Sequence, residues 1–101
     1  MLELSFRATV VEWRGPAPFF YARVPMEASA EIAAVKRAAS SGWGAIPVTA
    51  QIGEVSFTTS LFPKDGTYLL PLKAVVRRRL EVTVGDEVAV QMSVGSAGWA
   101  G

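Results

Sequence analysis

The residues whose types could do chemistry lie close together, within residues 60–80. Lys64 and Asp65 are adjacent, Lys73 follows, and residues 77–79 are three consecutive arginines. Lysine and arginine bind anionic groups, and a carboxylate accepts hydrogen bonds that can orient a ligand. These side chains therefore predict anion binding, provided that the fold brings them to one surface.

The chain of 101 residues contains no histidine and no cysteine. Their absence excludes imidazole acid–base catalysis, thiolate nucleophiles, disulfides and zinc–thiolate sites. A hydrolase that uses Ser60 with Lys64 or Lys73 as its base is an alternative that remains. Hydroxyl side chains that alternate along a strand more often lie on its polar face, however. We therefore expect a protein that is not an enzyme and that needs no cofactor and no metal.

The charged residues also have a purely structural explanation. Pro63 to Gly66 are turn-forming residues, so Lys64 and Asp65 can simply form the exposed tip of a hairpin. Lys73 and Arg77 are neighbours at i and i+4 on a helix, where they can contact phosphate or only solvate the outer surface. The net charge of +1 gives the whole chain little attraction for nucleic acid. Nucleic-acid binding is therefore an alternative and not the first expectation.

Two tryptophans stand beside glycine-containing loops and could line a pocket at a loop end. Barrel mouths commonly hold ligands, which makes such a pocket a candidate site. The candidate ligand-binding residues are Trp13, Arg14, Trp43, Lys64, Asp65, Lys73 and Arg77. In this site the tryptophans would supply apolar contact, the arginines and Lys73 would contact an anion, and Asp65 would orient a donor group.

These residues must be positioned by short strands, because apolar and polar side chains alternate along most of the chain. The alternation predicts six strands, over residues 4–10, 19–24, 45–52, 55–61, 68–70 and 88–94. Phe6 and Phe57 fall on inward positions and are assigned to the core. Gly53-Glu54 is a two-residue turn between two strands, which predicts a β-hairpin.

Two helices interrupt the strands. Apolar residues spaced by three and four after Pro25 predict an amphipathic helix, which ends at Ser40-Ser41-Gly42. A shorter helix is predicted to begin at Pro71, because Leu72, Val76 and Leu80 share one helical face. The fold class is therefore mainly β: a small closed or double-split β-barrel of about six strands, with one amphipathic helix and one short helix.

The chain is expected to form a single barrel domain over residues 1–94, with a flexible C-terminal tail over residues 95–101. No stretch approaches the ~20 apolar residues of a membrane span, and no signal peptide is visible at the N-terminus. We therefore expect a cytoplasmic protein that has no contact with a membrane.

Several short motifs occur in a fixed order along most of the chain. They are WRGPAP (13–18), VP (24–25), WGAIPV (43–48), TSLFPKDG (59–66), LPLK (70–73) and GD (85–86). Together they resemble the family of small bacterial proteins known as domain of unknown function 1905, over roughly Phe6 to Val94. The resemblance implies a small closed barrel related to the double-split type, and it implies no activity. Residues 71–88 also have a local resemblance to the swapped-hairpin half-barrels of the AbrB and MazE type.

The sequence thus predicts a non-catalytic binding or interaction module, whose partner is a small anionic ligand or a protein. One alternative is an AbrB-like dimer that binds nucleic acid, and the second is the Ser/Lys hydrolase. A monomer and a homodimer are both compatible with the sequence.

Overall fold

The computed structural model describes residues 2–13, 19–39 and 46–94, which form six strands and two helices. In chain order these are β1 (Leu2–Trp13), β2 (Phe19–Arg23), α1 (Met26–Ala39), β3 (Ile46–Ile52), β4 (Val55–Lys64), β5 (Thr67–Pro71), α2 (Ala74–Leu80) and β6 (Glu87–Val94). Each of the six predicted strands and both predicted helices is present.

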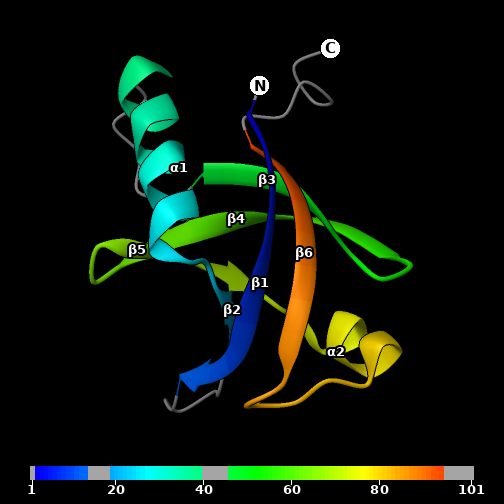
Figure 1. Ribbon diagram of the computed structural model, residues 1–101. Coiled ribbons are helices and arrows are strands. Elements are labelled where there is room, and N and C mark those ends of the chain that lie inside the picture. Colours follow the sequence, from blue (N-terminus) through cyan, green and yellow to red (C-terminus); the bar gives the residue numbers. More distant parts are fainter. Residues whose placement is uncertain (1, 14–18, 40–45, 95–101) are drawn as a thin grey trace.

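The strands close into an antiparallel barrel in the order β1-β2-β5-β4-β3-β6 (Figure 1). The long strand β1 closes it, because its first part pairs with β6 and its last four residues pair with β2. The predicted mainly-β barrel is therefore confirmed, and the barrel closes within one chain. Within the described residues, closure gives each strand a neighbour on both sides, apart from strand ends such as residues 62–64 of β4, which pair with β5 alone.

The barrel interior is filled by every second residue of the strands, whose side chains point inward and are apolar. Along β3 every second residue is buried, from Ile46 to Ile52, and the same holds along β6 from Val88 to Val94. Each buried valine, isoleucine or methionine among them contributes about 1.5–3 kcal/mol when it is removed from water, so this interior stabilises the fold. Phe6 and Phe57 pack against this core, as predicted.

The helix α1 packs on β1 and β5, and α2 packs on β4 (Figure 1). The apolar stripe of α1 is buried at Ala28 and Ile32. Ser29 is also buried; its hydroxyl donates to the Val24 carbonyl at 3.3 Å and accepts from the Tyr68 N–H at 3.3 Å. This serine therefore connects α1 to β5 and to the residue that follows β2.

The short helix α2 begins at Ala74, three residues later than predicted. Pro71 is the last residue of β5 and lies opposite Tyr21 of β2. The N–H of Leu72 then donates to the Phe20 carbonyl at 2.9 Å, which keeps the backbone extended beyond the proline. The helix therefore begins only after Leu72, the last residue that bonds to β2.

The turn predicted over Pro63 to Gly66 is shorter in the structure. β4 continues through Pro63 and Lys64, and only Asp65 and Gly66 form the turn, both with positive φ (52° and 82°). An Asp-Gly pair with two positive φ angles is the preferred two-residue connection of a hairpin. Pro63 is tolerated in the strand because β4 is paired there with β5 alone, beyond the end of its pairing with β3.

Candidate functional site

The outward side chains of β2, β5 and the adjacent ends of β1 and β4 form a surface rich in rings. Residues directly opposite each other in a ladder share a face of the sheet, and so do residues two apart in a strand. The register pairs Trp13 with Phe19, Tyr21 with Pro71, and Phe62 with Leu69. Their neighbours Val10, Ala22 and Leu70 point inward and are fully buried. We call these six outward residues the aromatic face: Trp13, Phe19, Tyr21, Phe62, Leu69 and Pro71.

The rings of the aromatic face are accessible to solvent. Trp13 is 49% exposed, Phe19 55% and Phe62 47%, and no other aromatic side chain in the described part of the chain is as exposed. Phe19 and Tyr21 lie side by side, with ring centroids 6.5 Å apart. Exposed rings gathered on one surface are typical of interaction sites, whereas single exposed apolar residues need no explanation.

Leu69 shows that the aromatic face is packed and not merely exposed. It is 7% exposed but does not belong to the main core cluster. It points outward between Arg23 on β2 and Phe62 on β4, where the side chains beside it and α1, which packs on β5, are the groups that can cover it. The aromatic face is therefore a small apolar layer on the outside of the barrel.

A groove of about 580 Å³ lies where the aromatic face meets α2. It is lined by Phe19, Phe20, Tyr21, Phe62 and Pro71, with Lys73 and Arg77 on the α2 side. The guanidinium carbon of Arg77 lies 3.8 Å from the centroid of the Phe20 ring, and its Nε donates to the Leu72 carbonyl at 3.2 Å. Within the described residues, Arg77 has no carboxylate partner.

A second hollow, of about 390 Å³, lies at the other end of the aromatic face, and we call it the basic hollow. Its lining includes Arg7, Arg23, Lys64, Asp65 and Thr67. The ammonium of Lys64 lies over the Trp13 ring, 4.0 Å from its centroid. This contact joins the basic hollow to the rings of the aromatic face.

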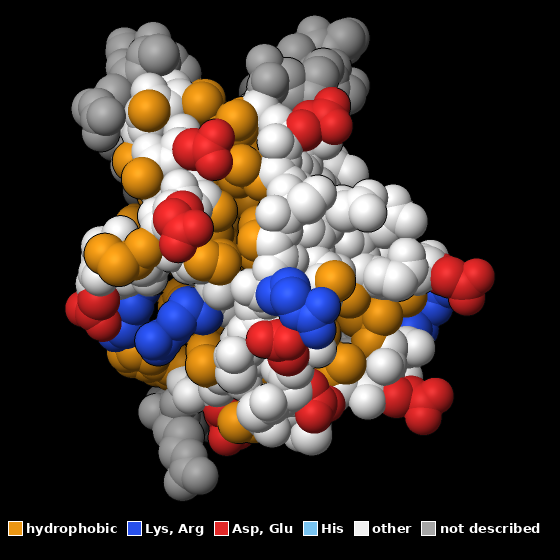
Figure 2. Space-filling model, in the orientation of Figure 1, with side chains coloured by type: hydrophobic (Ala, Val, Ile, Leu, Met, Phe, Trp, Pro, Cys, Tyr) orange, Lys and Arg blue, Asp and Glu red, His pale blue; other side chains and the backbone are white. Residues whose placement is uncertain are grey.

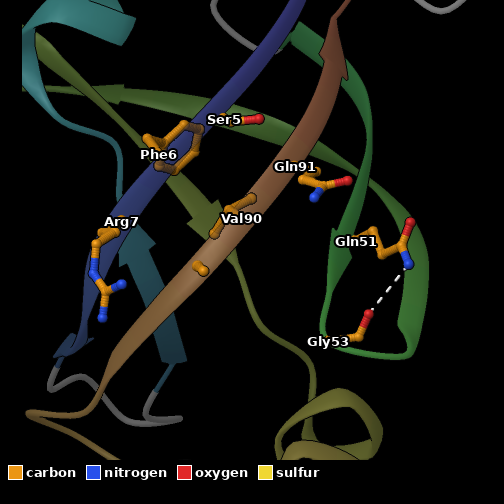
Figure 3. Close-up of a pocket in the computed structure, with 8 residues that line it drawn as sticks. Ser5, Phe6, Arg7, Gln51, Gly53, Val90 and Gln91 are labelled. Carbon is orange, nitrogen blue, oxygen red and sulfur yellow. Dashed lines mark hydrogen bonds between the residues drawn. The ribbon is translucent and has the colours of Figure 1, made fainter.

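The outward side of β1, β6 and β3 carries small polar side chains and amides in place of rings (Figure 3). The register places Ser5 and Gln51 opposite Gln91, and Thr49 opposite Ser93. These five residues, Ser5, Thr49, Gln51, Gln91 and Ser93, are named the polar face. Ser5, Gln51 and Gln91 line a hollow of about 410 Å³ that Figure 3 shows, and the Gln51 amide donates to the Gly53 carbonyl at 3.1 Å.

The described residues hold no group of three or more acidic side chains that could bind a metal ion. None of the helices in the described ranges is long and apolar enough to cross a membrane. Ser60 makes no hydrogen bond to Lys64 or Lys73, all of which the structure describes.

The family model described as domain of unknown function (DUF1905) matches residues 6–92. The chain belongs to this family. The resemblance drawn from the sequence motifs is thereby confirmed, and the family assigns no activity to its members. A search of curated proteins found no match to this chain.

In this DUF1905 chain, the structure brings the predicted site residues together in two groups. Lys73 and Arg77 share the groove, while Trp13, Lys64 and Asp65 lie at or beside the basic hollow. The other two candidates, Arg14 and Trp43, lie outside the described residues. Asp65 is an exposed turn residue, which agrees with the structural explanation of its position.

The sequence reasoning missed Phe19, Tyr21, Phe62 and Arg23 as members of the site. A signal was present in the alternation of β2, where Ala22 is inward and Phe19, Tyr21 and Arg23 must therefore be outward. Arg78 and Arg79, which are not among the candidate residues, are exposed and do not line the groove.

Proposed function

We propose that this DUF1905 protein is a non-catalytic binding module whose ligand is an anion with a flat apolar body. The ligand would lie in the groove, with its charge at Arg77 and Lys73 and its apolar part against the rings of Phe19, Tyr21 and Phe62. The observation that carries the proposal is the guanidinium of Arg77, which is half-buried against a ring and has no counter-ion among the described residues.

The two contacts of Arg77 fix the position of its guanidinium but leave most of its hydrogen-bond donors and its charge without a partner among the described residues. The Phe20 ring takes one flat side, and the Leu72 carbonyl takes the Nε–H. The two Nη groups have no protein acceptor among the described residues. A guanidinium presents five N–H donors in a planar fork that suits a carboxylate or a phosphate, so four donors remain for a ligand.

The apolar walls of the groove are the reason for proposing that the ligand has a flat apolar part. Phe19, Tyr21, Phe62 and Pro71 present flat apolar surfaces, and the volume of about 580 Å³ falls within the range of small-molecule sites. Ligand sites of this kind combine mostly apolar walls with a few polar groups that fix the orientation of the ligand.

The alternatives from the sequence have less support. The hydrolase would need Ser60 in hydrogen-bond reach of a lysine, and the structure shows no such bond. An AbrB-like dimer is not needed to complete the barrel, because one chain closes it. The double-split type of barrel, the bacterial source and the cytoplasmic location stay predictions.

The test uses 8-anilinonaphthalene-1-sulfonate, a fluorescent aromatic sulfonate, titrated into the wild type and two variants. We expect Arg77→Gln to weaken binding roughly tenfold or more, because a hydrogen-bonded charge pair is worth about 1.5–3 kcal/mol. The matched control is Arg78→Gln, which removes the same charge from the next residue of α2, outside the groove.

Equal affinities for Arg77→Gln and the wild type would refute the groove as the site, and so would equal losses in the two variants. Chemical denaturation of each variant establishes that it is folded, because this probe also binds partly unfolded proteins. Amide chemical shifts of residues 19–21 and 71–73 should move on titration, and those of the polar face should stay in place.

A further inference from the structure

The aromatic face has a cationic hollow at each of its two ends. The groove holds Lys73 and Arg77, and the basic hollow holds Lys64 with Arg7 and Arg23. Among the described residues, these five cations share the two linings with a single carboxylate, Asp65, although Arg7 is also paired with Glu87 beside the basic hollow. The aromatic face is therefore bordered by positive charge, although the net charge of the chain is only +1. Figure 2 shows Lys and Arg side chains gathered on the side of the barrel below α1, in contrast to the mostly uncharged surface over β3 and β6.

The basic hollow extends further along β2 than the groove does, although the Lys64 ammonium reaches back to Trp13, which lies opposite Phe19. Phe19 lines the groove and Arg23 lines the basic hollow, and they are four residues apart on β2. At about 3.3 Å per residue this separates their backbones by about 13 Å. A ligand that uses both ends must be extended, with its negative charges repeated along its length.

The surface between the ends carries the remaining rings. Tyr21 lies midway between Phe19 and Arg23 on β2, and Phe62 is two residues from Lys64 on β4. Trp13 stays 49% exposed even with the Lys64 ammonium over its ring. An extended ligand would therefore meet exposed flat rings between two sets of cations.

We infer that the ligand is single-stranded nucleic acid, which crosses the aromatic face from the groove to the basic hollow. This inference rests on the proposed function of the groove and adds the basic hollow as a second contact site. Phosphates contact Arg77 and Lys73 at one end and Arg23 and Lys64 at the other, and unstacked bases lie on the rings between them. Surfaces that combine cations with aromatic side chains bind single strands in this way, with sites of about 4–16 nucleotides.

The rings distinguish this ligand from other polyanions. A duplex keeps its bases stacked within the helix, so exposed rings would gain nothing from it, whereas a single strand can place bases on them. An acidic peptide without aromatic residues, such as poly-glutamate, would be attracted by the cations but would have no flat groups to stack on the exposed rings.

The test measures the fluorescence anisotropy of labelled dT12 with the wild type and with Arg23→Gln, Arg77→Gln, Phe19→Leu and Arg79→Gln. For four phosphate contacts the affinity should fall about fiftyfold between 50 and 200 mM salt, because single strands lose about 0.7 in logarithmic slope per contact. Arg23→Gln and Arg77→Gln should each reduce that slope by about 0.7.

Phe19→Leu keeps apolar bulk but removes the ring, and it should weaken binding about tenfold. Arg79→Gln, exposed on α2 outside the groove, is the control and should change the affinity less than twofold.

The outcomes separate this inference from the proposed function. Binding of the aromatic sulfonate without binding of dT12 would overturn the inference and leave the groove proposal in place. The inference is also overturned if Arg23→Gln leaves dT12 affinity unchanged while Arg77→Gln weakens it, because the ligand would then be confined to the groove. Equal affinity for a 12-base-pair duplex or for a 12-residue poly-glutamate would likewise overturn it. If Arg77→Gln changes neither dT12 nor sulfonate binding, both proposals fail.

Discussion

The aromatic face and the polar face are built on the same barrel, yet they have opposite characters. Both lie outside strands whose inward residues are buried and apolar, from Val10 and Leu70 beneath one face to Val90 and Ala50 beneath the other. The outward residues of the polar face are serine, threonine and glutamine, whereas those of the aromatic face are rings, a leucine and a proline. The inward residues alone would stabilise the barrel on both sides.

The difference between the two faces shows that the exposed rings of the aromatic face are not required for the barrel to fold. The polar face shows how this chain solvates the outside of a strand when nothing else is required. The exposed Trp13, Phe19 and Phe62 depart from that pattern at a cost in solubility, and exposed apolar clusters of this kind mark binding sites. The proposed binding function is therefore placed on the aromatic face and not on the polar face, although both contain a hollow.

The largest expected effect is the loss of stability in Leu70→Ala. Leu70 and its neighbour Leu69 are buried on opposite sides of β5. Leu70 is fully buried in the core, so Leu70→Ala should lower the free energy of unfolding by about 2–5 kcal/mol. Leu69→Ala should cost about 1–2 kcal/mol, because its cover is a surface layer that can collapse or admit water. Chemical denaturation of both variants measures the difference.

The same pair tests whether the aromatic face is a binding surface. Leu69→Ala should weaken binding of the aromatic sulfonate, since it removes the support of the rings around it. Leu70→Ala should leave the affinity of the folded protein nearly unchanged. Equal stability losses and equal affinities in the two variants would show that β5 has no distinct outer layer.

Much of the fold could be predicted from the sequence because inward alternation is a local signal. The pattern from Ile46 to Ile52 is buried at every second residue, as the sequence indicated, and so is that from Val88 to Val94. The start of α2 was predicted three residues early, because the bond between Leu72 and Phe20 joins residues about fifty positions apart. Such long-range contacts leave no trace in a local pattern.

The candidate site was predicted only in part, for the same reason. Lys73 and Arg77 were recognised as a pair because they are close in sequence. The contact of Lys64 with Trp13 depends on the strand order β1-β2-β5-β4, which the sequence does not reveal. In β2 both sets of alternating residues contain an aromatic side chain, so only the charged Arg23, which alternates with Phe19 and Tyr21, indicates that these two rings face outward.

A smaller effect is expected at Ser29, which supports the strands of the aromatic face from α1. Ser29→Ala removes the acceptor of the Tyr68 N–H and the donor to the Val24 carbonyl, and leaves both groups in a buried position. We expect a loss of about 1–2 kcal/mol in unfolding free energy, in the lower part of the usual range because both bonds are 3.3 Å long.

The control for this change is Ser5→Ala on the polar face, which should stay within about 0.5 kcal/mol of the wild type. Hydrogen exchange gives the more specific readout. The amide of Tyr68 should exchange faster in Ser29→Ala, and the amides of β3 and β6 should keep their protection. Uniform loss of protection across the barrel would contradict the local role of Ser29.

The smallest effect is expected at the boundary between the two faces, where Arg7 of β1 pairs with Glu87 of β6 at 2.8 Å. Both side chains are exposed (70% and 55%), so Glu87→Gln should cost no more than about 1 kcal/mol in stability. The change releases Arg7, which lines the basic hollow, and the affinity for dT12 at low salt should rise about twofold. Gln91→Ala, at the centre of the polar face, should leave that affinity unchanged. If Glu87→Gln instead leaves the affinity unchanged, the electrostatic attraction does not reach Arg7, and the binding surface ends at Arg23 and Lys64.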